Sequence, residues 1–505
     1  MSETYPATEM HPEEFRRFGY RVVDWIADYL AHPERYPVLA RTNPGALRRA
    51  LPSEPPEDGE SMEAILADFE QLIVPGITHW NHPAFFAYFA ITGSTPGILG
   101  ELLSAALNVN AMLWKTSPAA TELEEVALDW LRQLVGLPPQ FGIIMDTASV
   151  ASLCAIVAAR EAVEEHPIRQ EGLIGAPRLR LYTSEQAHSS IEKAAIVLGL
   201  GQRGVRKMPT DAAFRLDVGA LEQAIQEDRA AGWRPFCVVA TVGTTSTTSV
   251  DPVPAIADLC AREGLWLHVD GAYAGMAAVV PEFRWVLDGC DRADSVVINP
   301  HKWLFTPIDC SALFCRRPDL LRRAFSLVPE YLRTAEAEQA GVRDFMDYGV
   351  QLGRRFRALK LWMVMRYFGR EGLAARLRQH IRLGQTFAAW VDAHPDFERM
   401  APTPFSVVCF RAHPADLREH GEPEREAYLD ALNSALLDAV NATGSAYLSH
   451  TRLGGRFTLR LAVGNLRTTE AHVRLAWELL LEYARRLHAA HGGGAEEKAR
   501  AFGKG

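Results

Sequence analysis

An aspartate and a lysine follow two apolar runs of the chain and suit one kind of cofactor chemistry. Asp270 ends the apolar run 265–269 and is followed by two small residues, which let a bulky group approach the backbone. Lys302 follows the run 295–299. A lysine amine can form a Schiff base with pyridoxal phosphate, and an aspartate can keep its pyridine nitrogen protonated, so that the ring becomes an electron sink. The pair alone is also compatible with Asp270 capping a helix and Lys302 lying on the surface.

Two further loops supply groups that such a cofactor needs. The stretch 146–149, Asp-Thr-Ala-Ser, follows the apolar run 142–145 and precedes a helical pattern, so it offers free backbone N–H groups and hydroxyls to a phosphate. His188 follows the run 180–183 and offers an imidazole that could stack on a flat ring. A lone histidine there usually has a structural role. Phosphate donors, a stacking ring, a carboxylate and an amine together indicate a cofactor site.

These loops need a scaffold that brings them together. From about residue 85 to 367, helical patterns alternate with short runs that are apolar on both faces. This alternation predicts a mainly parallel sheet covered by helices on both sides. In such α/β sheets, ligands bind in the loops beyond the carboxyl ends of the strands. We therefore expect the four loops to meet at one edge of the sheet.

Segments on either side of this α/β region form separate units. Residues 13–30 and 62–73 carry apolar side chains at helical spacing. Two such helices cannot enclose a core, so we expect them to pack on a partner subunit. The C-terminal end is Gly-rich and charged, which is typical of a disordered tail. The expected division is an N-terminal helical segment (1–84), a large cofactor-binding domain (85–380), a small C-terminal α+β domain (381–487) and a disordered tail (488–505).

Composition excludes several function classes. The 53 basic and 62 acidic residues give a net charge of −9, which argues against binding to nucleic acid or an anionic membrane. The seven cysteines are odd in number and never spaced as CxxC, so they indicate neither a disulfide framework nor a cysteine zinc site. The chain shows no signal-peptide pattern and no apolar run long enough to span a membrane. We expect a cytoplasmic protein.

Two motifs resemble signatures of other chemistry, but their neighbouring residues do not fit those signatures. Residues 199–204 match GxGxxG, but they end a helical pattern and lead into an extended stretch, whereas a dinucleotide fingerprint follows a strand and opens a helix. They predict a helix end and a turn. His79 and His82 could suggest a metal site, but no acidic or cysteine neighbour completes a ligand set. We expect a packed or pocket-lining segment there, and no metal.

The chain resembles the aromatic L-amino acid decarboxylases, members of the group II pyridoxal-phosphate-dependent decarboxylases with the aspartate aminotransferase type (type I) fold. The resemblance runs from about residue 15 to about 483. It implies pyridoxal 5'-phosphate as cofactor and a mainly parallel seven-stranded sheet. It also implies an obligate homodimer with active sites at the subunit interface. It is carried by 78–80 (Thr-His-Trp), 85–89 (Phe-Phe-Ala-Tyr-Phe), 117–124, 185–190, 268–275, 299–303 (Asn-Pro-His-Lys-Trp) and 352–357 (Leu-Gly-Arg-Arg-Phe-Arg).

The resemblance also implies roles for individual residues. Lys302 matches the Schiff-base lysine, Asp270 the partner of the pyridine nitrogen and His188 the stacking imidazole. Tyr331 matches a mobile-loop tyrosine that protonates the substrate Cα. The positions that match the family's phosphate site are Ala148, Ser149, Asn299 and His301. Thr147, in the stretch 146–149, is also expected to bind the cofactor. Thr245 and Ala272 match further cofactor contacts. The positions expected to surround the substrate are Trp80, Tyr88, Phe89, Ile91, Asn110, Met112 and Gly353.

The activity that the resemblance implies is the decarboxylation of aromatic L-amino acids to arylalkylamines and CO2. Tyr331 and His188 favour this reaction over the alternative, a decarboxylation-dependent aromatic aldehyde synthase. Gly353 matches a position where, among plant relatives, glycine accompanies indolic and serine phenolic substrates. This favours tryptophan, with tyrosine, phenylalanine and DOPA as alternatives.

Some features depart from the family pattern or bear on other functions. Ile91 replaces a threonine of animal relatives, and the missing hydroxyl disfavours DOPA. Asn110 and Met112 replace an aliphatic residue and a phenylalanine. A non-catalytic scaffold with this fold would be expected to lack the lysine or the aspartate. An aminotransferase is disfavoured by the loop tyrosine and by the surroundings of His188.

Overall fold

The computed structural model describes residues 9–89, 91–327, 341–417 and 422–502 of the 505-residue chain. Its largest element is a seven-stranded sheet with the order β1-β7-β6-β5-β4-β2-β3. β7 is antiparallel to both neighbours, and the other neighbouring pairs are parallel. The predicted fold class is confirmed. The strands are β1 (Phe141–Met145), β2 (Arg178–Ser184), β3 (Val205–Met208), β4 (Trp233–Thr241), β5 (Trp266–Asp270), β6 (Ser295–Ile298) and β7 (Ser311–Cys315).

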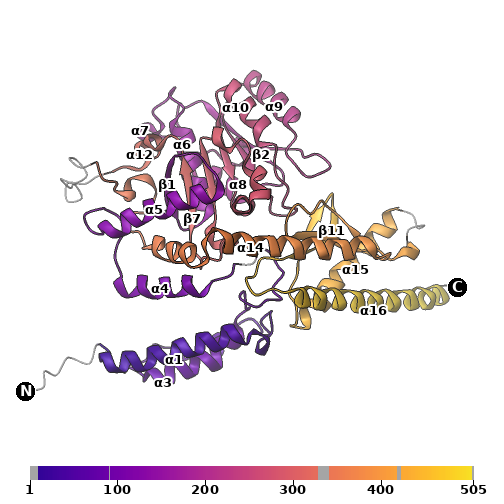
Figure 1. Cartoon of the computed structure of the whole chain (residues 1–505). Coiled ribbons are helices and arrows are strands. Elements are labelled where there is room, and N and C mark those ends of the chain that lie inside the picture. Colours follow the sequence, from indigo (N-terminus) through magenta and orange to yellow (C-terminus); the bar gives the residue numbers. More distant parts are fainter. Residues whose placement is uncertain (1–8, 90, 328–340, 418–421, 503–505) are drawn as a thin grey trace, which may run out of the picture.

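Helices cover both faces of this sheet because its strands are apolar on both faces (Figure 1). In β4, Cys237 and Val239 belong to one hydrophobic cluster, whereas Val238 and Ala240 belong to the other. The helices of the first cluster are α6 (Ala148–Glu161), α8 (Ser190–Val197) and α12 (Pro318–Phe325). Those of the second are α5 (Pro118–Val135), α9 (Val218–Ala230), α10 (Val253–Glu263) and α14 (Arg357–Ala393).

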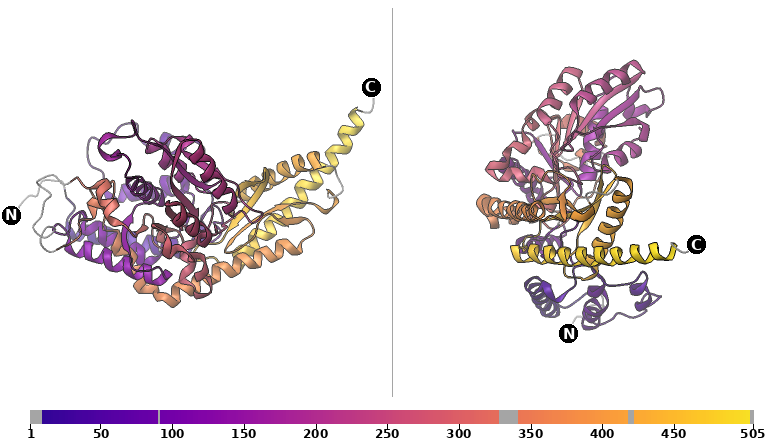
Figure 2. Two further views of the ribbon diagram at one scale, coloured as in Figure 1. Left: turned by 90° about the horizontal axis from the view of Figure 1, so that it is seen from above. Right: turned by 90° about the vertical axis from the view of Figure 1, so that its right-hand side faces the viewer.

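The C-terminal part forms a smaller α+β layer. Its antiparallel sheet has the order β10-β11-β9-β8. Two long helices pack with it and lie beyond the end of the large sheet (Figure 2). The elements are β8 (Phe397–Arg399), β9 (Val407–Ala412), α15 (Glu422–Ala442), β10 (Ser449–Leu453), β11 (Arg456–Ala462) and α16 (Glu470–Phe502).

The change from the large to the small core falls within one helix. In α14, Ile381 is the last residue of the large hydrophobic cluster, and Leu383 is the first of the small one. Residues 84–87 also pack in the small core, where the Phe86 N–H donates to the Tyr447 carbonyl at 2.8 Å. The division into domains stays a prediction. Residues 84–87 pack with the small core, whereas the predicted large domain begins at residue 85.

The last described element, α16, runs through the glycines at 492–494 to Phe502. The disordered tail expected from residue 488 stays a prediction. Once a helix exists, each further residue adds a hydrogen bond, and the stretch 495–502 is rich in Ala, Glu, Lys and Arg, which favour helix.

The N-terminal helices lie side by side at one end of the molecule (Figures 1 and 2). Arg17 of α1 (Pro12–Ala31) pairs with Glu63 of α3 (Met62–Asp68) at 2.9 Å, and the Trp25 and Phe69 rings lie 5.0 Å apart. A groove of about 1110 Å³ separates α1 from α4 (Thr95–Leu107) and is lined mostly by apolar side chains. Phe15 and Leu102 remain 64% and 54% exposed. Within the described residues, these helices therefore leave apolar faces uncovered.

Short elements complete the described chain. Among the described helices, none is long and apolar enough to cross a membrane. The short helices are α2 (Ala46–Ala50), the π-helical turn Phe69–Ile73, α7 (Ile168–Glu171) and α11 (Pro300–Trp303). The 3-10 turns are Pro33–Arg35, Val74–Gly76, Gln202–Gly204, Ala274–Val279, Pro281–Leu287, Cys290–Arg292, Phe345–Tyr348 and Ala415–Leu417.

The two misleading motifs have structural roles. α8 ends at Val197, and Gly199 and Gly201 follow with φ of 77° and 69°. The predicted helix end and turn are confirmed, because these left-handed conformations favour glycine. His79 accepts or donates a hydrogen bond with the Tyr29 hydroxyl at 3.0 Å, and His82 accepts one from the Ala84 N–H at 3.0 Å. Both histidines are buried in a packed segment.

Candidate active site

Neighbouring strands bring the predicted cofactor residues to one edge of the sheet. β6, β5, β4 and β2 are adjacent and parallel, so their carboxyl ends lie in a row. Lys302 on α11 follows β6, Asp270 ends β5, Thr245 follows β4 and His188 follows β2. The expected meeting of the Lys302, Asp270 and His188 loops thus follows from the strand order, whereas the fourth expected loop, 146–149, follows β1 on the other side of β7.

Lys302, Asp270 and His188 interact electrostatically. Burial lowers the pKa of the Lys302 amine, and the negative charge of Asp270 opposes this shift. Burial and the nearby charge of Lys302 lower the pKa of His188. A lower pKa leaves more of the Lys302 amine unprotonated, which is the form that reacts with an aldehyde. A neutral His188 ring suits stacking on a flat cofactor.

Backbone contacts hold two of these side chains in place. Asp270 is 6% exposed, and its Oδ1 accepts a hydrogen bond from the Ala272 N–H at 3.1 Å. The Nδ1 atom of His188 accepts one from the Ser190 N–H at 3.2 Å and lies 2.9 Å from the Ser190 hydroxyl. The carboxylate and the imidazole are therefore oriented by the chain itself.

The residues expected at a phosphate lie at the start of α6 and around α11. Thr147 caps α6 and accepts a hydrogen bond from the Val150 N–H at 3.4 Å, which leaves the N–H groups of Ala148 and Ser149 at the open start of the helix. The Asn299 side chain accepts a hydrogen bond from Ser311 at 2.7 Å. Free N–H groups at a helix N-terminus suit a phosphate. Together with an amine, a carboxylate and an imidazole, this donor set fits pyridoxal phosphate.

Four buried histidines make the fold sensitive to acid. Burial lowers the pKa of His82, His268 and His380 to about 4 and that of His301 to about 3. Because these values lie below the ordinary one of about 6.5, the unfolded chain binds more protons between about pH 6.5 and pH 4. We therefore expect the free energy of unfolding to fall as the pH drops through this range, by about 1.4 kcal/mol per pH unit for each histidine.

Urea unfolding between pH 7.5 and 4.5 measures this slope. His380 accepts a hydrogen bond from the Trp303 indole at 3.0 Å, and a glutamine can accept the same bond without titrating. His380→Gln should make the slope less steep, and His11→Gln on the exposed start of α1 serves as the control. An unchanged slope in His380→Gln would contradict the prediction.

Aromatic side chains adjoin Lys302. The Phe89 ring stacks on Tyr273 at 4.1 Å, and Tyr273 stacks on Trp303 at 4.7 Å. The Lys302 Nζ lies 5.5 Å from the centre of the Phe89 ring. Trp80 stacks on Tyr88 at 5.8 Å. Within one chain, Trp80, Tyr88 and Phe89 thus form an aromatic segment that reaches the amine; Ile91 follows Phe89 by two residues.

Three other predicted substrate residues form a separate group. The Asn110 Oδ1 accepts a hydrogen bond from the Arg354 N–H at 2.9 Å, and its Nδ2 lies 3.4 Å from the Met112 Sδ. A Cβ on Gly353 would lie 3.8 Å from that Nδ2. Among the described residues, no hydrogen bond or ring contact joins this group to Phe89 or Trp80. Tyr331 lies outside the described residues.

Sequence reasoning missed Arg460 and Tyr273. The Arg460 guanidinium donates to the carbonyls of Thr245 and Ser246, each at 2.9 Å, and so holds the loop after β4. The Tyr273 hydroxyl lies 2.9 Å from that of Ser406, directly before β9. A signal for Arg460 exists, since it is a charged residue within the apolar strand β11. No sequence signal marks Tyr273, because its contacts come from segments that are distant in the chain.

Arg354 and Glu124 form a buried ion pair beside the second group. The Arg354 Nη2 lies 2.6 Å from the Glu124 Oε1, and the side chains are 5% and 2% exposed. The guanidinium also donates to the carbonyls of Ile144 at 2.9 Å and Ala111 at 3.2 Å. The pair therefore connects the Ala111 loop and the Gly353 segment to β1.

Removing one member of this pair should destabilise the fold strongly. Glu124→Ala leaves the Arg354 charge buried without its carboxylate, so we expect the free energy of unfolding to fall by about 3–5 kcal/mol. Glu125→Ala is the matched control, because Glu125 pairs with Arg343 at 3.1 Å on the exposed side of the same helix. Its loss should cost about 1 kcal/mol or less. Equal losses in urea unfolding would refute the role of the buried pair.

Comparison with known proteins finds similarity over nearly the whole chain. The family model of the pyridoxal-dependent decarboxylase conserved domain matches residues 44–413. Tyrosine decarboxylase 3 of Petroselinum crispum is 42% identical, covering 96% of this chain and 94% of its own length. A phenylacetaldehyde synthase of a Rosa hybrid cultivar is 40% identical over 94% of each chain. The crystal structure of Oryza sativa TDC with PLP and tryptamine has a TM-score of 0.91 and 39% identity, covering 96% of this chain and 100% of that one.

Proposed function

Because the chain belongs to the pyridoxal-dependent decarboxylase family, as a carboxy-lyase of the aromatic L-amino acid group that uses pyridoxal phosphate, we propose that it decarboxylates tryptophan in preference to other aromatic amino acids and releases tryptamine. The observation that carries this preference is the bare backbone at Gly353. The nearest atom that a Cβ there would meet is the Asn110 Nδ2 at 3.8 Å, so a glycine leaves room for a wider ring.

Each of several residues of the chain has its own role in this reaction. Bound pyridoxal phosphate supplies a ring that accepts the electron pair left behind when CO2 departs. Lys302 holds the cofactor through its amine, and the Asp270 carboxylate keeps a proton on the ring nitrogen. His188 would pack its ring on the bound cofactor, and the N–H groups of Ala148 and Ser149 would bind the phosphate. Phe89, whose ring centre lies 5.5 Å from the Lys302 Nζ, would form an apolar wall beside the amine.

We also propose a homodimer in which each chain completes the other's pocket. Asn110, Met112 and Gly353 are grouped apart from the aromatic segment that reaches Lys302. The apolar groove between α1 and α4 offers a surface for the second chain. Analytical ultracentrifugation should give twice the mass of one chain. Leu102→Glu, on the exposed face of α4, should shift the mass towards the monomer and reduce activity; an active monomer would contradict the shared pocket.

Product analysis tests the proposed reaction. The protein loaded with pyridoxal phosphate is incubated separately with tryptophan, tyrosine, phenylalanine and DOPA, and amine, aldehyde and CO2 are followed by mass spectrometry. We expect tryptamine and CO2 as the leading products. Gly353→Ser should shift the preference towards the phenolic substrates, whereas Gly59→Ser, where a Cβ would meet no atom within 4 Å, should not. A tyrosine preference in the unaltered enzyme would overturn the tryptophan assignment.

An aldehyde synthase is the second candidate, because phenylacetaldehyde synthases are about as similar to this chain as the decarboxylases are. Tyr331 favours the amine, since a tyrosine hydroxyl can return a proton to the substrate Cα. We expect Tyr331→Phe to lower the amine yield and to produce aldehyde, ammonia and hydrogen peroxide with consumption of O2. An unchanged amine yield without aldehyde would exclude Tyr331 as the proton donor.

A further inference from the structure

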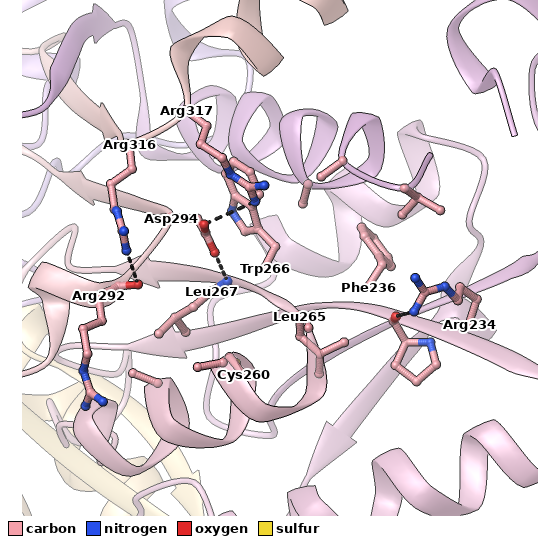
Figure 3. A pocket seen from close by; sticks show the side chains of 17 residues that line it. Arg234, Phe236, Cys260, Leu265, Trp266, Leu267, Arg292, Asp294, Arg316 and Arg317 are labelled. Atoms are coloured by element: carbon pink, nitrogen blue, oxygen red, sulfur yellow. Dashed lines mark hydrogen bonds and ion pairs between the residues drawn. The ribbon is translucent and has the colours of Figure 1, made fainter. Parts of the chain in front are cut away.

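Figure 3 shows a pocket of about 570 Å³ in the large domain region. It lies at the edge of the large sheet opposite to the candidate active site. Its lining includes Phe236, Leu265 and Trp266 from the amino ends of β4 and β5, whereas Asp270 lies at the carboxyl end of β5. The ends of α6 and α10 supply further apolar wall residues. Its volume is typical of small-molecule sites. The pocket is therefore separate from the residues assigned to the cofactor.

The pocket carries an excess of positive charge. Three of its four lining arginines pair with the carboxylates of Glu165, Asp258 and Asp294, so one positive charge remains among the described residues. The four arginines are Arg234, Arg292, Arg316 and Arg317. This local excess contrasts with the net charge of −9 of the whole chain. Such an excess favours an anionic ligand.

Local contacts hold the guanidinium groups in place, as Figure 3 shows. Arg317 lies 4.6 Å from the centre of the Trp266 ring and pairs with Asp294 at 3.2 Å. The other carboxylate oxygen of Asp294 accepts a hydrogen bond from the Leu267 N–H at 2.9 Å. Arg316 donates to the Arg292 carbonyl at 2.9 Å. Arg316 and Arg317 are thus each held by a neighbouring group of the pocket, which reduces the side-chain entropy that they lose on binding.

Arg316 is the arginine with free donors. Arg234 pairs with Glu165 at 2.9 Å, and Arg292 pairs with Asp258. Arg316 makes no ion pair with any carboxylate that the structure describes, and its described hydrogen bond goes to a carbonyl. A guanidinium has five N–H donors in a planar fork, so most of those of Arg316 are available to a ligand.

We propose that this pocket is a binding site for a small organic phosphate. The phosphate head binds to Arg316, because a guanidinium fork matches two phosphate oxygens and no described carboxylate pairs with this arginine. Arg317, which pairs with Asp294, adds further N–H donors. The organic part lies against the apolar wall near Phe236 and Leu265. This site is independent of the proposed decarboxylation.

Titration calorimetry of the holoenzyme with phenyl phosphate tests the site, since the bound cofactor then occupies its own phosphate site. We expect saturable binding that is tighter than that of inorganic phosphate, which lacks the apolar part, and tighter than that of benzoate, which carries one charge. Arg316→Gln should weaken the binding of phenyl phosphate by about tenfold or more, the effect of losing a charge-assisted pair.

Arg178→Gln is the matched control, because Arg178 also lies over a tryptophan at the same edge of the sheet, 4.1 Å from the centre of the Trp233 ring, but does not line the pocket. It should leave binding unchanged. Both arginines are exposed, and thermal unfolding checks that each variant is folded. Absence of saturable binding, or equal losses in the two variants, would overturn the site. Tighter binding of benzoate would overturn the phosphate class.

Discussion

Replacing Lys302 with alanine is expected to lower the rate of decarboxylation on the order of 10⁴-fold or more, the scale seen when a covalent catalytic residue is removed. The residue lies on α11 directly after β6, with its amine 5.5 Å from the Phe89 ring. Burial lowers the pKa of this amine, which increases the fraction in the unprotonated form that can attach the cofactor. The visible absorbance of the covalently held cofactor should be lost together with the activity.

Lys207→Ala is the matched control for this variant. Lys207 lies on β3, and its amine pairs on the surface with Glu192 at 2.7 Å. Its replacement should leave both the absorbance spectrum and the rate unchanged. If Lys302→Ala kept the spectrum of the unaltered enzyme, the cofactor would be attached elsewhere and the assignment of this site would be wrong.

Asp270→Asn is expected to lower kcat by about 10²- to 10³-fold, which is the usual effect of removing one well-placed electrostatic group. Asparagine has the shape of aspartate and can still accept the hydrogen bond from the Ala272 N–H. It carries no negative charge to keep a proton on the ring nitrogen. The cofactor should therefore stay attached while the ring becomes a weaker electron acceptor.

Separate measurement of kcat and KM distinguishes this role from a structural one. We expect the loss to fall on kcat, with the absorbance of the attached cofactor retained. Asp217→Asn, at the cap of α9, is the control, since its side chain also accepts a backbone N–H, from Ala220 at 3.0 Å, on the surface. A loss confined to KM, or loss of the cofactor itself, would contradict the electrostatic role of Asp270.

The residues of the cofactor site were predictable because their signals are local. Asp270 and Lys302 directly follow strands that are apolar on both faces, and such strands stand out in the sequence as short runs between helical patterns. β7 did not stand out in this way, because it is a short antiparallel strand close behind α11. Its insertion between β1 and β6 places the start of α6 on the far side of that strand from Lys302.

The surroundings of the site depend on contacts between segments far apart in the chain. Arg460 of β11 holds the carbonyl of Thr245, more than 200 residues away, and Arg354 reaches Glu124 over a similar separation. A single sequence carries no pattern for such pairs. The grouping of Asn110 with Gly353, apart from Phe89, was hidden for the same reason.

Sequence patterns were sufficient to predict the fold class, the cofactor chemistry and the strand-end positions of Lys302, Asp270 and His188. The pattern of apolar residues in strands and the common edge at which parallel strands end both follow from local backbone geometry. These three residues lie at or after the carboxyl ends of such strands. The tertiary structure alone decided the division of the substrate residues into two groups, the buried pair of Arg354 with Glu124, and the arginine pocket at the opposite edge. Each of these depends on how helices and loops from distant parts of the chain pack over the sheet, which the spacing of residues within one segment does not encode.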